Sequence, residues 1–173
     1  MSLGGPAEST FLRECIAKAH EQGTIVVSAA GNEIPTVMFP AAFPEVVAVA
    51  ATHAAKAPWR FTGLDRVVDI AAPGEDVWCA RAKRKESDAA PTFASGMGTG
   101  TSFATACVAG LAALWLSYHG GRGAIAQSTY SGNLRLVPFA FHYLLARTAN
   151  NTFDFVRHGK YGAGIADAEK LLR

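Results

Sequence analysis

The feature that most constrains the fold is a glycine-rich turn that leads directly into a long apolar segment, at residues 96–117. Three of its first five residues are glycine, so the backbone can take conformations closed to other residues and can approach a ligand closely. From Phe103 to Leu116 the segment has no charged residue and no proline. The pattern predicts a helix that is apolar on every face and buried at the centre of a domain.

Ser102 lies where the turn becomes the helix. Unpaired backbone N–H groups and the positive end of the helix dipole meet there, so a hydroxyl at this position is well placed beside a developing oxyanion. Three interpretations compete: a serine that caps a core helix, a phosphate-binding loop and a nucleophile. The phosphate loop is disfavoured because the turn has no lysine. The G-x-S-x-G elbow of the α/β-hydrolases is absent, because Ala104 stands two residues after the serine.

Two separate segments resemble the subtilisin-like serine peptidases. Gly100-Thr-Ser-Phe-Ala104, followed by Val108-Ala-Gly110, resembles the nucleophile segment of that family. Residues 25–33 resemble the strand and turn that carry its oxyanion-hole asparagine, which is Asn32 in this chain. The resemblance implies an α/β fold, namely a three-layer subtilisin-like domain with a mostly parallel sheet. Only the C-terminal half of that domain, with its central nucleophile helix, is expected here.

The chain's hydrophobic pattern agrees with an α/β domain. Apolar residues at helical spacing predict a helix over residues 8–22, with His20 on the surface near its end. Short apolar runs predict three buried parallel strands, at residues 24–29, 46–51 and 67–71. A further helix is predicted at residues 138–149, with Pro138 in its first turn. Relative to the family, 75–95 and 120–135 are interpreted as insertions. Both are expected to be loops. The first is expected to be a solvated, basic surface loop, and the alternative for it is a processing site or a binding site for an acidic partner.

The resemblance implies peptide-bond hydrolysis through an acyl-enzyme, with Ser102 as the nucleophile and Asn32 as an oxyanion donor. Met38 stands where many relatives carry the glycine at the floor of the specificity pocket, so its side chain is expected to shorten that pocket. Asp69 matches a weak cation site of some relatives, so a weakly bound calcium or monovalent cation is the one cofactor considered. The substrate-binding residues that the resemblance implies are Ser2, Leu3, Gly4, Ala29, Ala30, Gly31, Met38 and Thr101.

The sequence departs from the family in the other catalytic residues. The family's aspartate and histidine motifs precede the substrate-binding strand, which here begins at Ser2, and none of the five histidines has a His-Gly-Thr-like context. Residues 1–173 are therefore interpreted as the C-terminal portion of one catalytic domain. This portion is expected to be inactive without the N-terminal half that carries the aspartate and the histidine. Ala106 and Cys107 replace a proline and a histidine of the family, which keeps open a non-catalytic pseudo-peptidase or peptide-binding half-domain.

The expected partners follow from the same interpretation. They are a peptide or protein substrate, the missing N-terminal half and, through exposed core surface, a second copy of the chain. The formal net charge of +2 gives no indication of a nucleic-acid partner. The apolar run at 103–118 is short and rich in small residues, so no membrane partner is expected. The three cysteines have neither an even number nor metal-ligand spacing.

Overall fold

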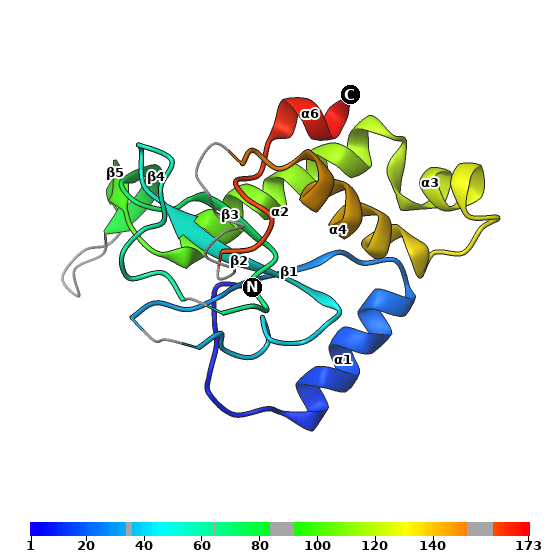
Figure 1. Cartoon of the computed structure of the whole chain (residues 1–173), viewed down its shortest axis with the longest axis horizontal. Coiled ribbons are helices and arrows are strands. Elements are labelled where there is room, and N and C mark those ends of the chain that lie inside the picture. Colours follow the sequence, from blue (N-terminus) through cyan, green and yellow to red (C-terminus); the bar gives the residue numbers. More distant parts are fainter. Residues whose placement is uncertain (34–35, 64, 84–91, 152–160) are drawn as a thin grey trace.

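The computed structural model of the chain describes residues 1–33, 36–63, 65–83, 92–151 and 161–173. A parallel sheet runs through the middle in the order β1-β2-β3, and β4 and β5 form a separate antiparallel hairpin (Figure 1). In chain order the elements are α1 (Thr10–Glu21), β1 (Val26–Ala29), β2 (Val46–Thr52), β3 (Ile70–Pro73), β4 (Val77–Lys83), β5 (Thr92–Gly98), α2 (Thr101–Tyr118), α3 (Gly121–Thr129), α4 (Leu136–Thr148) and α6 (Ala168–Leu172).

Strand β2 is the centre of the sheet because it pairs with both neighbours. Val46 stands opposite Val26 of β1, and Thr52 stands opposite Pro73 of β3. All of its residues are buried, as expected for a parallel strand that is covered on both faces. The three predicted strands are confirmed, although β3 begins later than residue 67. The chain is still turning there, since the Val68 N–H donates to the Asp65 carbonyl at 3.2 Å.

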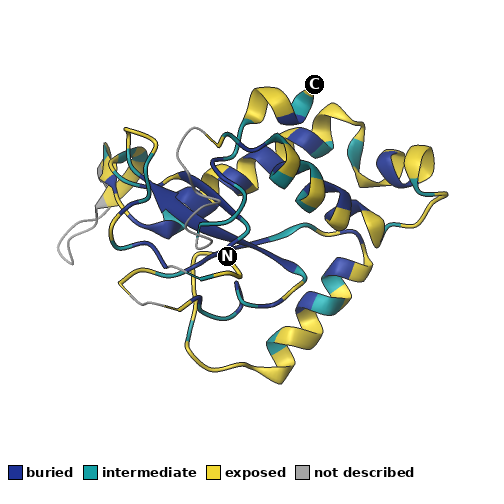
Figure 2. Ribbon diagram, in the orientation of Figure 1, coloured by how far each residue is buried: buried dark blue, intermediate teal, exposed yellow. Residues whose placement is uncertain are grey.

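The two faces of the sheet bury different sets of side chains. Val47 and Val49 of β2 belong to the larger core, which is shared with α2 and α4. Ala48 and Ala50 point to the opposite face, into a smaller core that includes Ile165. Helix α1 packs beside that second face through Ile16. Burial is concentrated in the sheet and on the inward sides of the helices (Figure 2), which gives the predicted layered α/β arrangement.

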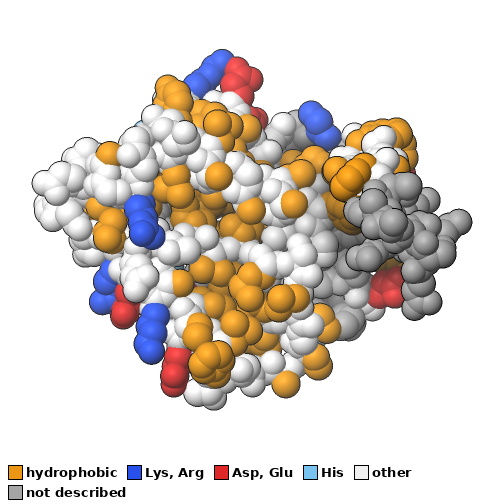
Figure 3. Space-filling model, turned by 180° about the vertical axis from the view of Figure 1, so that it is seen from behind, with side chains coloured by type: hydrophobic (Ala, Val, Ile, Leu, Met, Phe, Trp, Pro, Cys, Tyr) orange, Lys and Arg blue, Asp and Glu red, His pale blue; other side chains and the backbone are white. Residues whose placement is uncertain are grey.

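Helix α2 packs against all three strands of the parallel sheet but buries only one of its sides. The opposite side is open, with Leu114 50% and Tyr118 65% exposed. Seen from behind, hydrophobic side chains spread across the middle of the molecule (Figure 3). The prediction of a helix buried on every side is therefore wrong for the described part of the chain. By length and composition alone α2 could cross a membrane, but a core helix passes the same test.

Both segments expected to be loops contain regular structure. The first segment, residues 75–95, contributes most of the β4–β5 hairpin. Residues 84–91, which include the basic residues Arg84 and Lys85, lie outside the described residues. Trp78 and Phe93 are 66% and 83% exposed on the hairpin. The second segment forms α3, because burial of Ile125 and Ala126 outweighs the poor helix propensity of its glycines.

His20 is buried, which contradicts its predicted surface position. Its ring lies 4.6 Å from the ring of Phe139 in α4, in an edge-on arrangement. Burial lowers the pKa of His20, because it disfavours the charged imidazolium. The position of His20 near the end of a helix suggested a solvated cation. The spacing of residues within α1 does not predict that α4 lies over this end of the helix.

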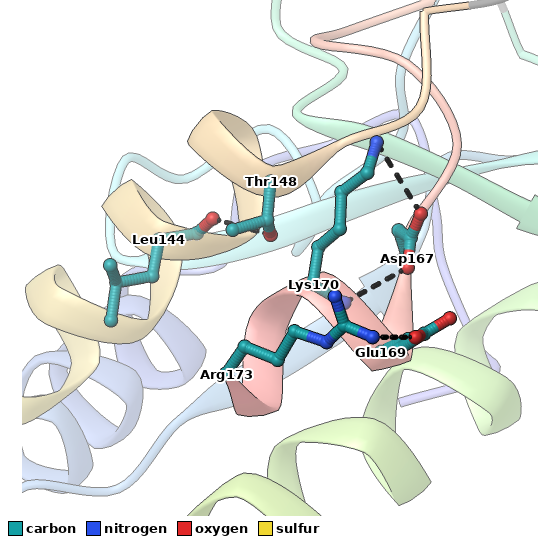
Figure 4. A network of polar contacts seen from close by, with 6 residues as sticks. All are labelled: Leu144, Thr148, Asp167, Glu169, Lys170 and Arg173. Carbon is teal, nitrogen blue, oxygen red and sulfur yellow. Dashed lines mark hydrogen bonds and ion pairs between the residues drawn. The ribbon is translucent and has the colours of Figure 1, made fainter.

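Local polar contacts fix the C-terminal helix α6 (Figure 4). Asp167 caps it, with its carboxylate accepting from the Lys170 N–H at 3.1 Å and lying 3.6 Å from the Lys170 ammonium. That backbone hydrogen bond lowers the pKa of Asp167. Arg173 pairs with Glu169 one turn later. Exposed pairs of this kind add little stability, so the contacts mainly define where the helix begins.

Candidate active site

Asn32 follows β1 and is held by the first residue of α2. Its side-chain oxygen accepts two hydrogen bonds from Thr101, one from the backbone N–H and one from the hydroxyl, each at 2.9 Å. A backbone N–H can only donate, so the atom that faces it must be the amide oxygen. The orientation of the carboxamide is thereby fixed, and its NH₂ group lies on the side of Gly100, where a Cβ would come within 3.1 Å of it.

Ser102 is the second residue of α2, at the positive end of the helix dipole. The turn before it depends on glycine, because Gly100 has φ of 144°. The Gly100 N–H donates to the Gly74 carbonyl at 2.7 Å, and a Cβ on Gly74 would lie 2.9 Å from the Gly100 carbonyl oxygen. The turn after β3 and the turn before α2 are therefore in direct backbone contact, which places Ser102 relative to the sheet.

A cavity of about 260 Å³ lies beside Ser102 and Asn32. Almost every residue expected to bind substrate lines it. Its lining consists of Ser2, Leu3, Gly4, Ala29, Gly31, Asn32, Met38, Thr101 and Ser102. Ala30 is the exception: it is fully buried, and its backbone bonds to Val49 and Met38 instead. The Ser2 hydroxyl donates to the Ser102 carbonyl at 3.2 Å, which joins the first residues of the chain to the start of α2.

The model of the subtilase family matches residues 1–164. This chain belongs to the subtilase family. It is 39% identical over 124 residues to a subtilisin of Bacillus pumilus, an alignment that covers 69% of this chain and 42% of the relative. It is also 34% identical over 175 residues to an extracellular protease of Xanthomonas campestris pv. campestris, which covers 99% of this chain and 27% of that protein. The subtilases are a family of serine peptidases, as the sequence motifs predicted.

Solved structures show the same fold. The prenylagaramide maturation protease PagA superposes with a TM-score of 0.70 at 24% identity, over 99% of this chain and 57% of that one. The self-cleaved protease domain of PatA gives a TM-score of 0.71 at 24% identity, over 99% of this chain and 59% of that one. The predicted subtilisin-like α/β fold is confirmed. This subtilase chain spans less than half the length of the two curated relatives.

The histidines of this subtilase that the structure describes make contacts elsewhere. The His53 ring accepts from the Ala55 N–H at 3.1 Å. The ring of His119, at the far end of α2, lies 5.5 Å from that of Trp115. His20 packs on Phe139. His158 lies outside the described residues. None of the described histidine contacts places an imidazole on Ser102.

His142 bonds to Asp69, the residue considered as a weak cation ligand. The His142 Nε2 lies 2.8 Å from one carboxylate oxygen of Asp69, and the Ala48 N–H donates to the other at 2.7 Å. A cation at Asp69 would therefore compete with His142. The described residues contain no group of three or more His, Cys, Asp and Glu side chains arranged to hold a metal ion. The spacing of residues in the predicted helix at 138–149 did not predict this pair.

The His142–Asp69 pair makes stability depend on pH. The hydrogen bond to Asp69 raises the pKa of His142, which outweighs the opposing effect of burial. Because the folded-state pKa is raised, the stabilisation is fully present below the unfolded pKa of about 6.5 and is lost as pH rises through the folded value. We expect urea unfolding from pH 6 to 9 to show the stability difference between the native chain and His142→Gln shrinking with rising pH. A difference that does not change with pH would contradict the assignment.

Proposed function

We propose that this chain supplies the nucleophile and the oxyanion site of a serine endopeptidase that cleaves peptide bonds through an acyl-enzyme. The observation that carries the proposal is the pair of bonds from Thr101 to the oxygen of Asn32, because it leaves the NH₂ group to donate. An uncharged donor that is already oriented suits an alkoxide that exists only during reaction. Ser102 stands one residue after Thr101, at the same cavity.

The reaction follows from these groups. The Ser102 Oγ attacks the carbonyl carbon of the scissile bond while a general base takes its proton, and the carbonyl electrons move onto oxygen. Asn32 NH₂ and the Ser102 N–H hold that oxyanion. When the carbonyl re-forms, the C–N bond breaks and the amine leaves with the proton from the base. Water then attacks the ester in the same way, which releases the acid and restores Ser102.

The general base and the carboxylate that orients it come, in this proposal, from a complementary N-terminal half of the domain. Two observations support this. The described histidines make contacts elsewhere, and the open side of α2, including Leu114 and Tyr118, offers apolar surface for another segment to cover. The chain alone is then expected to be inactive, because an unassisted serine is a weak nucleophile. The same surface favours self-association when no complementary segment is present.

Intact mass after treatment with a fluorophosphonate probe tests the proposal. The native chain alone should remain unlabelled, whereas the chain combined with a segment that supplies the base should gain one probe adduct. Ser102→Ala should abolish that adduct, and Ser128→Ala is the matched control, because Ser128 lies on α3 and donates to the Ile125 carbonyl. Peptide binding that survives Ser102→Ala, with neither labelling nor turnover in the assembled protein, would favour the non-catalytic half-domain instead.

A further inference from the structure

A second cavity, of about 570 Å³, lies beyond the carboxyl ends of β2 and β3. Its walls come from the segment after β2, within residues 52–56, from the turn between β3 and β4, within residues 73–77, and from Asn150 with residues 165–168 before α6. Of the residues that the structure describes, none lines both this cavity and the one beside Ser102. Ligands of open α/β sheets usually bind at this end of the strands, in cavities of about 300–1,000 Å³. The position and the size therefore fit a ligand site.

Backbone hydrogen bonds join the walls of this second cavity to one another. The Gly74 N–H donates to the Thr52 carbonyl at 3.0 Å, which joins the turn after β3 to the end of β2. The Ala166 N–H donates to the Ala71 carbonyl at 2.9 Å, which joins the third wall to β3. The lining is largely apolar, and Thr52 and Ile165 within it are almost completely buried. The cavity is thus a preformed apolar space, as ligand sites usually are.

Two charged side chains that line the cavity have no partner within the described chain. Neither the Lys56 ammonium nor the Glu75 carboxylate makes a hydrogen bond or an ion pair with a described residue. The other carboxylates of the lining are engaged. Asp167 caps α6 and lies beside the Lys170 ammonium (Figure 4), and Asp76 accepts from a hydroxyl of the segment before α2 at 3.4 Å. One positive and one negative charge, not paired with each other, are therefore available to a ligand.

The turn that carries Lys56 offers two hydrogen-bond donors to the cavity. The His53 Nδ1 accepts from the Ala55 N–H at 3.1 Å, so the ring proton is on Nε2, which can donate. Lys56 has φ of 60°, a left-handed conformation that lysine rarely adopts and that is often found at ligand sites. An ammonium and an imidazole N–H on one short turn suit a carboxylate of the ligand.

We propose that this cavity binds a short peptide with apolar side chains and two free termini. Its α-carboxylate pairs with the Lys56 ammonium and the His53 Nε2–H, its α-ammonium pairs with the Glu75 carboxylate, and its side chains pack on the apolar lining. A single amino acid would leave much of the space empty, and a chain segment without free termini would leave both charges unpaired. The inference goes beyond the proposed function, because it concerns a different cavity and needs no catalysis.

Titration of the ¹⁵N-labelled chain with three dipeptides tests the proposal. Leu-Leu carries both terminal charges, acetyl-Leu-Leu lacks the positive one, and Leu-Leu amide lacks the negative one. Kd is taken from the amide resonances of Gly74 and Asp76, whereas those of Gly4 and Gly31 report on the cavity beside Ser102. Leu-Leu should bind about two- to fivefold more tightly than either blocked peptide, as expected for the loss of one solvent-exposed ion pair.

Two variants assign each terminal charge to its partner. Lys56→Gln should remove the preference for Leu-Leu over Leu-Leu amide and keep the preference over acetyl-Leu-Leu. Glu75→Gln should do the reverse, because each variant removes the charge that faces one end of the peptide. Lys18→Gln and Glu14→Gln, at exposed positions of α1, are the matched controls and should change neither preference.

Every other outcome counts against the proposal. Equal affinity of the native chain for the three peptides would overturn it, even if a variant did not fold. Resonance shifts confined to Gly4 and Gly31 would place the peptide beside Ser102 instead, and unchanged resonances of Gly74 and Asp76 would remove peptides from the second cavity. Fluorophosphonate labelling of Ser102 still reports separately on the proposed function, because it does not depend on this cavity.

Discussion

Asn32→Leu should lower kcat of the assembled peptidase by about 10²–10³-fold and leave KM nearly unchanged, a magnitude that belongs to the corresponding asparagine of subtilisin, where it was measured. The physical reason is that the NH₂ group interacts with an oxygen that carries negative charge only in the transition state. Its loss therefore raises the barrier but does not weaken substrate binding. Steady-state kinetics with a peptide substrate would measure both constants.

Two comparisons give this prediction its specificity. Thr101→Val removes one of the two bonds that orient Asn32, so kcat should fall by roughly 2- to 10-fold, in line with the net worth of one hydrogen bond. Thr101→Ser restores the hydroxyl and should recover most of the loss. Asn133→Leu is the matched control, because Asn133 bonds to the Arg135 N–H in the segment before α4. A rise in KM equal to the fall in kcat would show that Asn32 binds the ground state as well.

The sequence singled out Ser102 and Asn32 as the candidate nucleophile and oxyanion donor because each stands beside a strong local signal. Ser102 follows a glycine turn and opens an apolar helix, and Asn32 directly follows a buried strand. Parallel strands and the helices that follow them bring such ends together at one edge of the sheet. The bonds from Thr101 to Asn32 could not be predicted this way. They join residues 69 positions apart and depend on rotamers that only the packed structure defines.

The sequence-based predictions of burial and of loops were wrong where residues that are close in space, but distant in sequence, determine the structure. His20 is buried because α4 lies over the end of α1. Residues 121–129 form α3 because Ile125 and Ala126 find apolar partners, although the local glycines disfavour a helix. The apolar composition of residues 103–116 correctly predicted a helix that belongs to the core, but it also predicted burial on every side, and one side of α2 is open in the described chain. The amino-acid composition of a helix shows that its surface is apolar, but it does not show which segment covers that surface.

Phe141→Ala should destabilise the chain by about 3–5 kcal/mol, because it removes a large ring from a fully packed site and leaves a cavity. Phe141 is completely buried in the larger core, and its ring lies 5.4 Å from that of Trp115 on α2. The loss is a large share of the roughly 5–15 kcal/mol that usually stabilises a domain. Urea unfolding followed by tryptophan fluorescence measures it directly, since Trp115 reports on this contact.

Tyr143→Ala is the matched control, because Tyr143 lies on the same helix but is mostly exposed, and surface changes usually cost within about 0.5 kcal/mol. Equal effects of the two variants would mean that α4 does not pack on α2 in solution. The comparison also bears on the active site. Trp115 and Ser102 belong to one continuous helix, α2, so the packing of Phe141 on Trp115 helps to hold that helix against the sheet. The position of Ser102 beside Asn32 depends on that contact, because Asn32 is attached to the sheet and Ser102 to the helix.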